Sequence, residues 1–536
     1  TFGVYHLWVT KDKSTRWGAQ PNLSNESWDC TFVYGDRIIY DVLGRFSGSP
    51  YHQQFTTPDG ALCHYKWTFP DDDKFLGATS FNKIHQPGNG PGDDDTLQRE
   101  QTGYWLLRQM GLPWNYRRFV AVYVNGGRRG VMMEDTQTPD SDVVKERWPN
   151  DSNGYLFKLQ PWFEFDAPGV GFDNDSWNTL NNFTTLGGEK KLARYRWNYL
   201  MRKTPTSAND YSKVFELVNA ANLPTSNPGA YTAALEAVMD TEQYIRTFAV
   251  EHSVGNWDSV GNNNGQNMYG YAGQTNRWQL LVWDLNILLA SSTGPDGPTG
   301  DDLFKLDGAN TPLANLVAFP KYKRAYWRAY KELADRWYVA TNYSPLMDAK
   351  FAALTAEGIG AATPAPIKSY MSARLGYLNS QLASIRTNFT LATNLVWLAD
   401  GNLATIAGAA PVEAKSILFN GQELPIVWVT PTRWRISFPA PWGTNSFTLQ
   451  GYDLWGNALT NVSGVVQVVN TNLPPPASGN LVINEIQYNP ATPGDSFVEL
   501  YNRSPNYTYD LSGWRMDGLG YPKMPLWSGI PLTISI

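Results

Sequence analysis

The order of hydrophobic periodicities along the chain limits the fold more than any other feature of the sequence. Residues 1–80 alternate β-forming residues with turn residues, and the later segments GVMMED and GYLFKL add further strands. Helical periodicity then dominates, over residues 191–202, 211–221, 231–253, 321–337 and 366–387. The first 390 residues therefore predict an α+β domain, with a strand-rich half followed by a helix-rich half.

Local signals place one long helix and one hairpin within the strand-rich half. A helix is expected over about Thr96–Met110, because Asp95 can cap it and Gln98 stands at the capping-box position. A glycine and a proline follow and end it. The Asn125-Gly126 pair between two apolar runs predicts a tight hairpin turn.

The pattern changes after residue 390 to short strands separated by turns. Residues 391–469, with Asn-Gly and Gly-Asn turns, predict a small immunoglobulin-like β-sandwich domain. Residues 470–480 contain three consecutive prolines and predict a linker. Residues 481–536 are again strand-like and predict a second β domain, incomplete within this sequence.

Composition excludes some classes of partner. With 43 basic and 49 acidic residues the net charge is -6, whereas a nucleic-acid-binding surface is basic. Charged residues make up 17% and aromatics 14%, a balance that favours a secreted or cell-surface protein. The most apolar stretch, Leu280–Ala290, is too short for a transmembrane helix. The chain starts at Thr1 without methionine, so we expect a mature or incomplete piece of a longer precursor.

Two features leave alternatives open. Cys30 and Cys63 could close a disulfide loop of about 33 residues, or they could be two separate buried thiols. The acidic loop from Asp296 to Asp302 could bind Ca²⁺, or it could be a solvated loop, because its acidic residues lack the EF-hand order. No CxxC or HExxH motif occurs, so a zinc site is not expected.

Seven segments carry a family resemblance. In chain order they are GRFSGSP, HYKWTFPDDDKFLGATSFNKI, LQREQTGYWLLRQMGLP, AVYVNGGRRGVMMED, GYLFKL, VGNWDSVGNNNGQNMYGY and WQLLVWDLN. Together they resemble the spore-coat protein H (CotH) kinase family over about residues 30–300. The resemblance implies an atypical protein-kinase-like fold that uses ATP and Mg²⁺ on a protein substrate. The segments VINEIQYNP, FVELYN and DLSGW resemble a lamin-tail-type immunoglobulin-like domain.

The resemblance implies a set of catalytic and metal-binding residues. Asp258 would orient the acceptor hydroxyl, and Asp284 would bind the metal ion. Asp284 interrupts an apolar run, where a carboxylate needs a charged or metal partner. Four asparagines follow Asp258 and could ligate the metal, namely Asn262, Asn263, Asn264 and Asn267. Ordinary kinase spacing favours Asn263, whereas the family pattern favours Asn267, which we prefer.

The remaining implied residues concern the nucleotide. Lys83 would contact the phosphates and Glu100 would hold that lysine, with Lys158 and then Lys66 as other candidate cations. Ser47 would contact phosphate, and Glu134 would lie on the adenine side. The family usually has a second aspartate at position 286, but this chain has Asn286. Asn286 can ligate Mg²⁺ through its carbonyl oxygen, although the site then carries one negative charge fewer.

Two functions are therefore compatible with the sequence. One is a secreted kinase that transfers phosphate from ATP to Ser or Thr of a protein partner, as the retained Asp258, Asn267 and Asp284 favour. The other is a structural or adhesive surface protein with degraded metal chemistry, as Asn286 favours. Such a protein would assemble through its β-sandwich domains into a homo-oligomer or filament.

Overall fold

The computed structural model describes most of the chain and divides it into two compact units, Thr1–Ser384 and Ile385–Ile536. The described residues are 2–20, 24–47, 58, 63–85, 87, 94–161, 177–262, 264–275, 277–290, 299–306, 310–488, 497–511 and 533–534. For residues 82–85, 510 and 533–534 the backbone alone is described. Within these ranges, no helix combines the length and the apolar character needed to cross a membrane.

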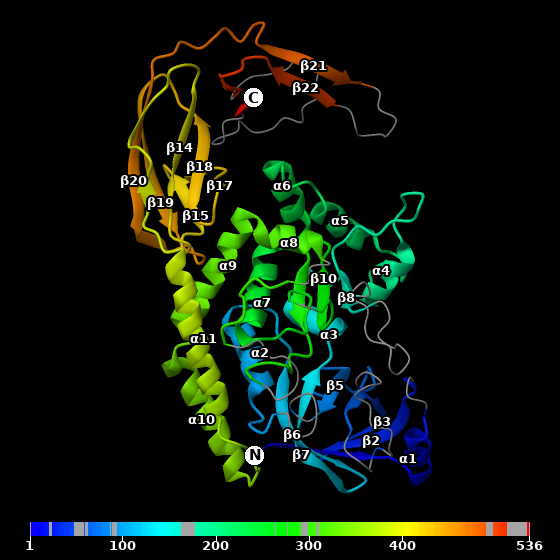
Figure 1. Ribbon diagram of the computed structural model, residues 1–536. Coiled ribbons are helices and arrows are strands. Elements are labelled where there is room, and N and C mark those ends of the chain that lie inside the picture. The colour runs from blue at the N-terminus through cyan, green and yellow to red at the C-terminus, as the bar shows by residue number, and fades with distance from the viewer. Residues whose placement is uncertain are drawn as a thin grey trace. The chain divides into compact units, whose positions relative to one another are not determined.

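A closed barrel forms the strand-rich half of the first unit (Figure 1). Its neighbours run in the order β1-β2-β3-β4-β5-β7-β6, with β1 and β6 paired in parallel. The strands are β1 (Gly3–Trp8), β2 (Trp28–Tyr34), β3 (Arg37–Phe46), β4 (Tyr65–Thr68), β5 (Ser80–His85), β6 (Arg117–Val124) and β7 (Gly127–Gln137). Buried aromatic rings, among them Tyr5, Phe32 and Trp67, fill the interior and meet mainly edge to face. Helix α1 (Lys11–Gly18) packs Trp17 into the same core.

The two cysteines belong to this aromatic core as separate thiols. Both side chains are buried and free, which settles the alternative that the sequence left open. Burial raises the pKa of Cys30 to about 12 and that of Cys63 to about 11. Neither thiol is therefore poised as a nucleophile.

Helix α2 (Arg99–Gln109) lies between β5 and β6 in the chain and begins later than expected. Asp94, not Asp95, provides the carboxylate at its start, because Asp94 accepts hydrogen bonds from the backbone N–H groups of Thr96 and Arg99 (3.1 and 2.8 Å). The expected hairpin is confirmed: β6 and β7 pair antiparallel around Asn125 and Gly126, both with positive φ.

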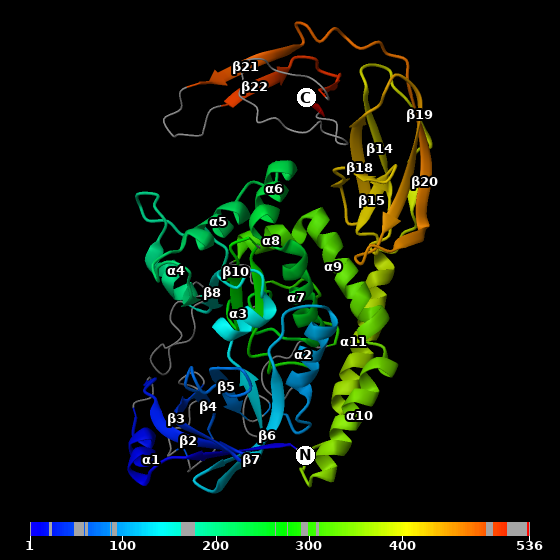
Figure 2. The same cartoon turned by 180° about the vertical axis from the view of Figure 1, so that it is seen from behind.

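A four-stranded sheet in the order β11-β10-β8-β9 begins the second half of the unit. Its strands are β8 (Tyr155–Leu159), β9 (Tyr199–Lys203), β10 (Met268–Ala272) and β11 (Gln279–Val282). The sequence pattern predicts a helix through residue 202, but α4 (Leu192–Asn198) ends early and β9 pairs with β8 instead. Figures 1 and 2 show this sheet between the barrel and helices α5 and α6.

Helices make up most of the remaining first unit. They are α3 (Ser141–Arg147), α5 (Ser212–Ala221), α6 (Pro228–Val238), α7 (Thr241–Val254), α8 (Thr311–Ala318), α9 (Pro320–Glu332), η2 (Leu333–Trp337), α10 (Ala340–Ala356) and α11 (Ala365–Ser384). The single helix expected over 231–253 is two, because Asp240 caps a new helix by accepting from the Gln243 N–H (3.2 Å). Helix α7 ends at Gly255, which is left-handed.

The second unit contains two sheets that share one apolar core. The first is β12-β14-β18-β17 and the second is β13-β20-β19-β15-β16. The strands are β12 (Thr390–Leu391), β13 (Leu395–Trp397), β14 (Leu403–Ala409), β15 (Ser416–Phe419), β16 (Gln422–Glu423), β17 (Val427–Trp428), β18 (Arg433–Pro439), β19 (Gly443–Tyr452) and β20 (Ala458–Asn470). Ile406 and Trp434 of one sheet and Phe419 and Val466 of the other are buried together. This is a β-sandwich arrangement, while its immunoglobulin-like class stays a prediction.

The last part of the chain forms short strand pairs. Strands β21 (Leu481–Gln487) and β22 (Phe497–Asn502) pair antiparallel, as do β23 (Tyr509–Asp510) and β24 (Thr533–Ile534). The lamin-tail assignment of residues 481–536 and the domain limits around the Pro-rich linker stay predictions.

Candidate functional site

Asp258 lies in the loop between α7 and β10, where three side-chain amides converge on its carboxylate. Oδ1 accepts from Asn264 (2.7 Å) and Gln266 (2.5 Å), and Oδ2 accepts from Asn267 (2.8 Å). Asn267 also donates to the Asp258 carbonyl oxygen (3.0 Å). These hydrogen bonds fix the orientation of the half-buried Asp258 carboxylate. A group that orients an attacking hydroxyl must itself be held in one orientation.

The pairing of β10 with β11 brings Asp284 close to Asn267 in the sheet. Asn267 immediately precedes β10, and its carbonyl oxygen accepts from the Trp283 N–H (2.9 Å), which extends the β10–β11 ladder by one position. Asp284 is the next residue after Trp283. Both Asn267 (φ 59°) and Asp284 (φ 56°) adopt left-handed backbone, which in residues other than glycine is uncommon and concentrates at functional sites. The structure thus gathers three of the residues predicted from the sequence.

The Asn267 amide has a defined orientation. A carboxylate only accepts hydrogen bonds, so the nitrogen of Asn267 must face Asp258. Its carbonyl oxygen then points away from Asp258. Asn267 Oδ1 and the Asp284 carboxylate are both of the oxygen type that Mg²⁺ prefers. Asn286 is half-buried two residues further on.

Close packing holds the loop that carries Asp258. A Cβ on Gly261 would lie 2.0 Å from the ring of Phe248, so glycine is required at that approach. The Gly261 carbonyl oxygen also lies 2.8 Å from His252 Nε2. Further along, the Leu289 N–H donates to the Val254 carbonyl (2.8 Å), which joins the segment after Asp284 to the end of α7.

Helix α2 contacts the segment that follows Asp284. The Arg99 guanidinium donates to the carbonyl oxygens of Leu289 and Ala290 (3.1 and 2.9 Å). A Cβ on Gly103 would lie 2.5 Å from Leu285, so the helix and this segment are in close contact. The Tyr104 hydroxyl donates to the Val282 carbonyl (3.2 Å). A displacement of α2 would therefore also move Asp284.

Glu100 of α2 takes part in a buried charge cluster with a residue that the sequence did not reveal. Arg117 of β6 forms ion pairs with Glu100 (2.7 Å) and Glu134 (2.9 Å), and all three side chains are at most 4% exposed. Burial alone would lower the pKa of Arg117, but the two glutamates raise it above its ordinary value. Burial raises the pKa of Glu134 although Arg117 opposes the shift. The Glu134 carboxylate is paired with Arg117. Its adenine-side role stays a prediction.

The comparison with protein families adds one finding. The model of a family described as CotH kinase protein matches residues 68–357, more than half of the 536-residue chain. The chain belongs to the CotH kinase family. The matched region runs from the end of β4 to just past α10 and includes Asp258, Asn267 and Asp284. No curated protein matches the chain at a significant level.

Membership in the CotH family confirms the resemblance inferred from sequence and leaves individual nucleotide contacts as predictions. Lys83 lies on β5, but its side chain is outside the described part of the chain. Lys158 of β8 is half-buried and directly opposite Tyr269, two residues from Asn267. Ser47 is buried at the end of β3, and its N–H donates to the His64 carbonyl (2.9 Å).

The other asparagine and acidic candidates have local roles or lie outside the described residues. Asn262 donates to the Asn256 carbonyl (3.0 Å), and Asn263 is not among the described residues. Asp296 also lies outside them, while Asp302 accepts from the Phe304 N–H (3.0 Å). Where the chain is described, no group of three or more His, Cys, Asp or Glu side chains could hold a metal. The Ca²⁺ site stays a prediction.

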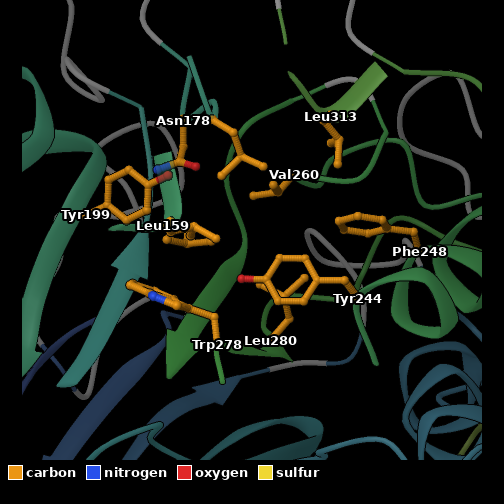
Figure 3. A pocket seen from close by; sticks show the side chains of 11 residues that line it. Leu159, Asn178, Tyr199, Tyr244, Phe248, Val260, Trp278, Leu280 and Leu313 are labelled. Atoms are coloured by element: carbon orange, nitrogen blue, oxygen red, sulfur yellow. The ribbon is translucent and has the colours of Figure 1, made fainter. Parts of the chain in front are cut away.

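A small cavity lies behind the Asp258 loop (Figure 3). Its walls are mainly apolar and aromatic and include Val260 of the loop, with Tyr244, Phe248 and Trp278. Figure 3 shows the Tyr244 hydroxyl pointing into it. The lining contains no charged side chain, so this cavity is unsuited to a nucleotide phosphate.

Glu251 of α7 is a second buried acidic residue near the candidate site that the sequence did not reveal. Its carboxylate is fully buried below the loop and accepts from the Ser259 hydroxyl (2.8 Å) and the Asn256 amide (3.3 Å). Burial raises the pKa of Glu251 to about 8, against the effect of these two hydrogen bonds, and the charge of Asp258 adds to the rise. Glu251 therefore carries a proton near neutral pH.

Relative to wild type, the variant Glu251→Gln should become more stable as the pH rises. The unfolded chain releases the Glu251 proton near the ordinary pKa of 4.5, whereas the folded protein keeps it up to about pH 8. Wild-type stability therefore falls across this window, because the folded state binds the extra proton. Between pH 5 and pH 8, the difference in unfolding free energy between Glu251→Gln and wild type should grow by about 3–4 kcal/mol. Urea unfolding at pH 5 and pH 8 measures it, with exposed Glu216→Gln as control; a pH-independent difference would be contrary to expectation.

Replacing Arg117 by leucine should destabilise the first unit by about 3–5 kcal/mol, because it leaves two buried carboxylates without their shared cation. The matched control is Arg16→Leu, which breaks the exposed pair of Arg16 with Asp12 and should cost at most about 0.5 kcal/mol. Urea unfolding of both variants compares them. Equal losses would show that the Arg117 cluster contributes no more than a surface pair.

Proposed function

We propose that this chain transfers the γ-phosphate of ATP to a serine or threonine hydroxyl of a protein partner. The observation that carries the proposal is the joining of Asp258, Asn267 and the residue before Asp284 by direct hydrogen bonds. The order of these parts also supports it, because catalytic aspartate, asparagine and metal-binding aspartate follow one another in protein kinases. Family membership supports the kinase-like class.

The chemistry of the donor set fits a magnesium ion. The Asp284 carboxylate and the carbonyl oxygens of Asn267 and Asn286 would hold it, and bound Mg²⁺ neutralises charge on the phosphates. Asp258 would orient the acceptor hydroxyl and accept its proton as that oxygen bonds to phosphorus and ADP leaves. The amides of Asn264, Gln266 and Asn267 would keep the Asp258 carboxylate aimed during this step.

Nucleotide binding is the first test. Mg²⁺ with a non-hydrolysable ATP analogue, at 100 times its dissociation constant, should stabilise the protein by about 2.7 kcal/mol. EDTA should remove this stabilisation, because the phosphates would lose their metal contact to Asp284. An unchanged melting temperature at millimolar analogue would refute the proposal.

Asn286 supports a second candidate function. With an amide in place of the family's second carboxylate, the site has less negative charge to hold Mg²⁺. A kinase-like protein without phosphate transfer would then act as a structural or adhesive surface protein. Absence of both nucleotide binding and phosphate transfer, together with a concentration-dependent oligomer in sedimentation, would favour this function over the first.

A further inference from the structure

Three cationic side chains from three strands of the first unit form no ion pair with a carboxylate of the described residues. Arg45 of β3 and Lys66 of β4 are directly opposite each other in an antiparallel pair, so they point to the same face. Their neighbours Phe46 and Tyr65 point into the barrel core. Arg45 and Lys66 therefore lie on the outer face of the barrel. Arg202 of β9 belongs to the other sheet.

The charge of Arg202 acts on both of the other cations. Burial and then the positive charges of Arg45 and Arg202 lower the pKa of Lys66 to about 8, although Asp140 opposes the shift. Burial and Arg202 also lower the pKa of Arg45. Like charges opposite each other in a sheet are destabilising, so this arrangement costs stability unless an anion binds there.

Within the described part of the chain, few contacts neutralise the charges of Arg45, Lys66 and Arg202. Arg45 donates to the Asn25 side-chain oxygen (2.7 Å) and the Phe46 carbonyl (3.1 Å), which are neutral groups. Asp140 is the carboxylate that acts on Lys66, but it caps α3 and accepts from the Asp142 N–H (2.9 Å) and the Ser80 hydroxyl (3.1 Å). Arg202 is exposed to solvent. The three cations thus have donor capacity for an external anion.

The sheet register separates Arg202 from Asn267. Arg202 lies on β9 near the level of Leu156, whereas Asn267 lies beyond the opposite end of β8, next to Leu159. About four residues along the strands and two strand spacings across the sheet give a backbone separation of roughly 16 Å. That distance is too large for the phosphate being transferred, and an extended peptide spans it with about five residues.

We propose that Arg45, Lys66 and Arg202 bind a phosphate group already present on the protein substrate, within about five residues of the acceptor hydroxyl. This inference rests on the proposed kinase function for its substrate. Two arginines with their planar donor forks, together with a lysine, match the geometry and double charge of a phosphomonoester better than those of one carboxylate. Such a site would favour substrates phosphorylated in an earlier step.

Calorimetric titration with inorganic phosphate and O-phosphoserine tests the site. Both probes should bind the protein already saturated with Mg²⁺ and a non-hydrolysable ATP analogue. Arg202→Gln should weaken the binding of both probes at least tenfold and change the dissociation constant of the analogue less than twofold. Lys66→Gln should weaken probe binding similarly. The control Lys74→Gln, which removes a cation paired with Asp142, should leave probe binding unchanged.

Two results would overturn the inference. If the analogue excludes phosphate and Arg202→Gln weakens the analogue by the same factor, the cluster holds the nucleotide's own phosphates. If wild type and Arg202→Gln bind phosphate equally, the cluster is not an anion site. Phosphate binding requires no phosphate transfer, so the titration still decides when the same protein has no kinase activity.

Discussion

Replacing Asp258 by asparagine should lower the rate of phosphate transfer about a thousandfold while nucleotide binding persists. The asparagine oxygen can still accept from Asn264 and Gln266, so the loop keeps most of its contacts. It cannot accept the proton of the acceptor hydroxyl, and general-base groups contribute about 10²–10⁴ in rate.

Transfer of radiolabelled phosphate under single-turnover conditions measures this loss, and calorimetry measures analogue binding. The control Asp302→Asn changes an aspartate of the same unit that bonds locally to Phe304, and it should keep the wild-type rate. A variant at Asp258 that transfers phosphate normally would remove this residue from the reaction.

Replacing Asp284 by asparagine should weaken Mg²⁺-dependent nucleotide binding by about 100-fold. The variant would leave only amide oxygens at positions 267, 284 and 286, and a metal-bound carboxylate contributes several kcal/mol of charge stabilisation. Asparagine tolerates the left-handed backbone at this position (φ 56°), so the fold should remain intact. Alanine would add backbone strain there.

Analogue titrations with and without Mg²⁺ separate the two contributions to binding. Metal-independent affinity should be the same in Asp284→Asn and wild type, whereas the gain on adding Mg²⁺ should disappear in the variant. An unfolded variant would instead indicate that Asp284 has a structural role, and an unchanged gain would place the metal elsewhere.

Much of the fold was predictable because its signals are local. The Asn125-Gly126 turn and helices α9 and α11 follow from turn chemistry and periodicity, whereas α8 and α10 were not expected. The errors arose where tertiary contacts override the local pattern. Residues Tyr199–Lys203 continue a helical periodicity, but backbone pairing with β8 makes them a strand.

The site was predictable to the extent that residues resemble a family motif. Asp258, Asn267 and Asp284 were predicted in this way, and hydrogen bonds join Asp258, Asn267 and the residue before Asp284. Arg117 was missed because an arginine at the start of a strand usually faces solvent, and its two glutamates are 17 residues away in sequence on either side. Glu251 was missed because one glutamate in a helix gives no sign of complete burial.

The central claim is that Asp258, Asn267 and Asp284 form one site for magnesium-dependent phosphate transfer. Its most direct test is incubation of the purified chain with γ-labelled ATP and casein or its own serines and threonines as acceptors, with Mg²⁺ or with EDTA. We predict label on serine or threonine in the presence of Mg²⁺, abolished by EDTA and by Asp258→Asn. Label that persists in Asp258→Asn, or its absence from wild type that binds Mg²⁺ and ATP, would contradict the account.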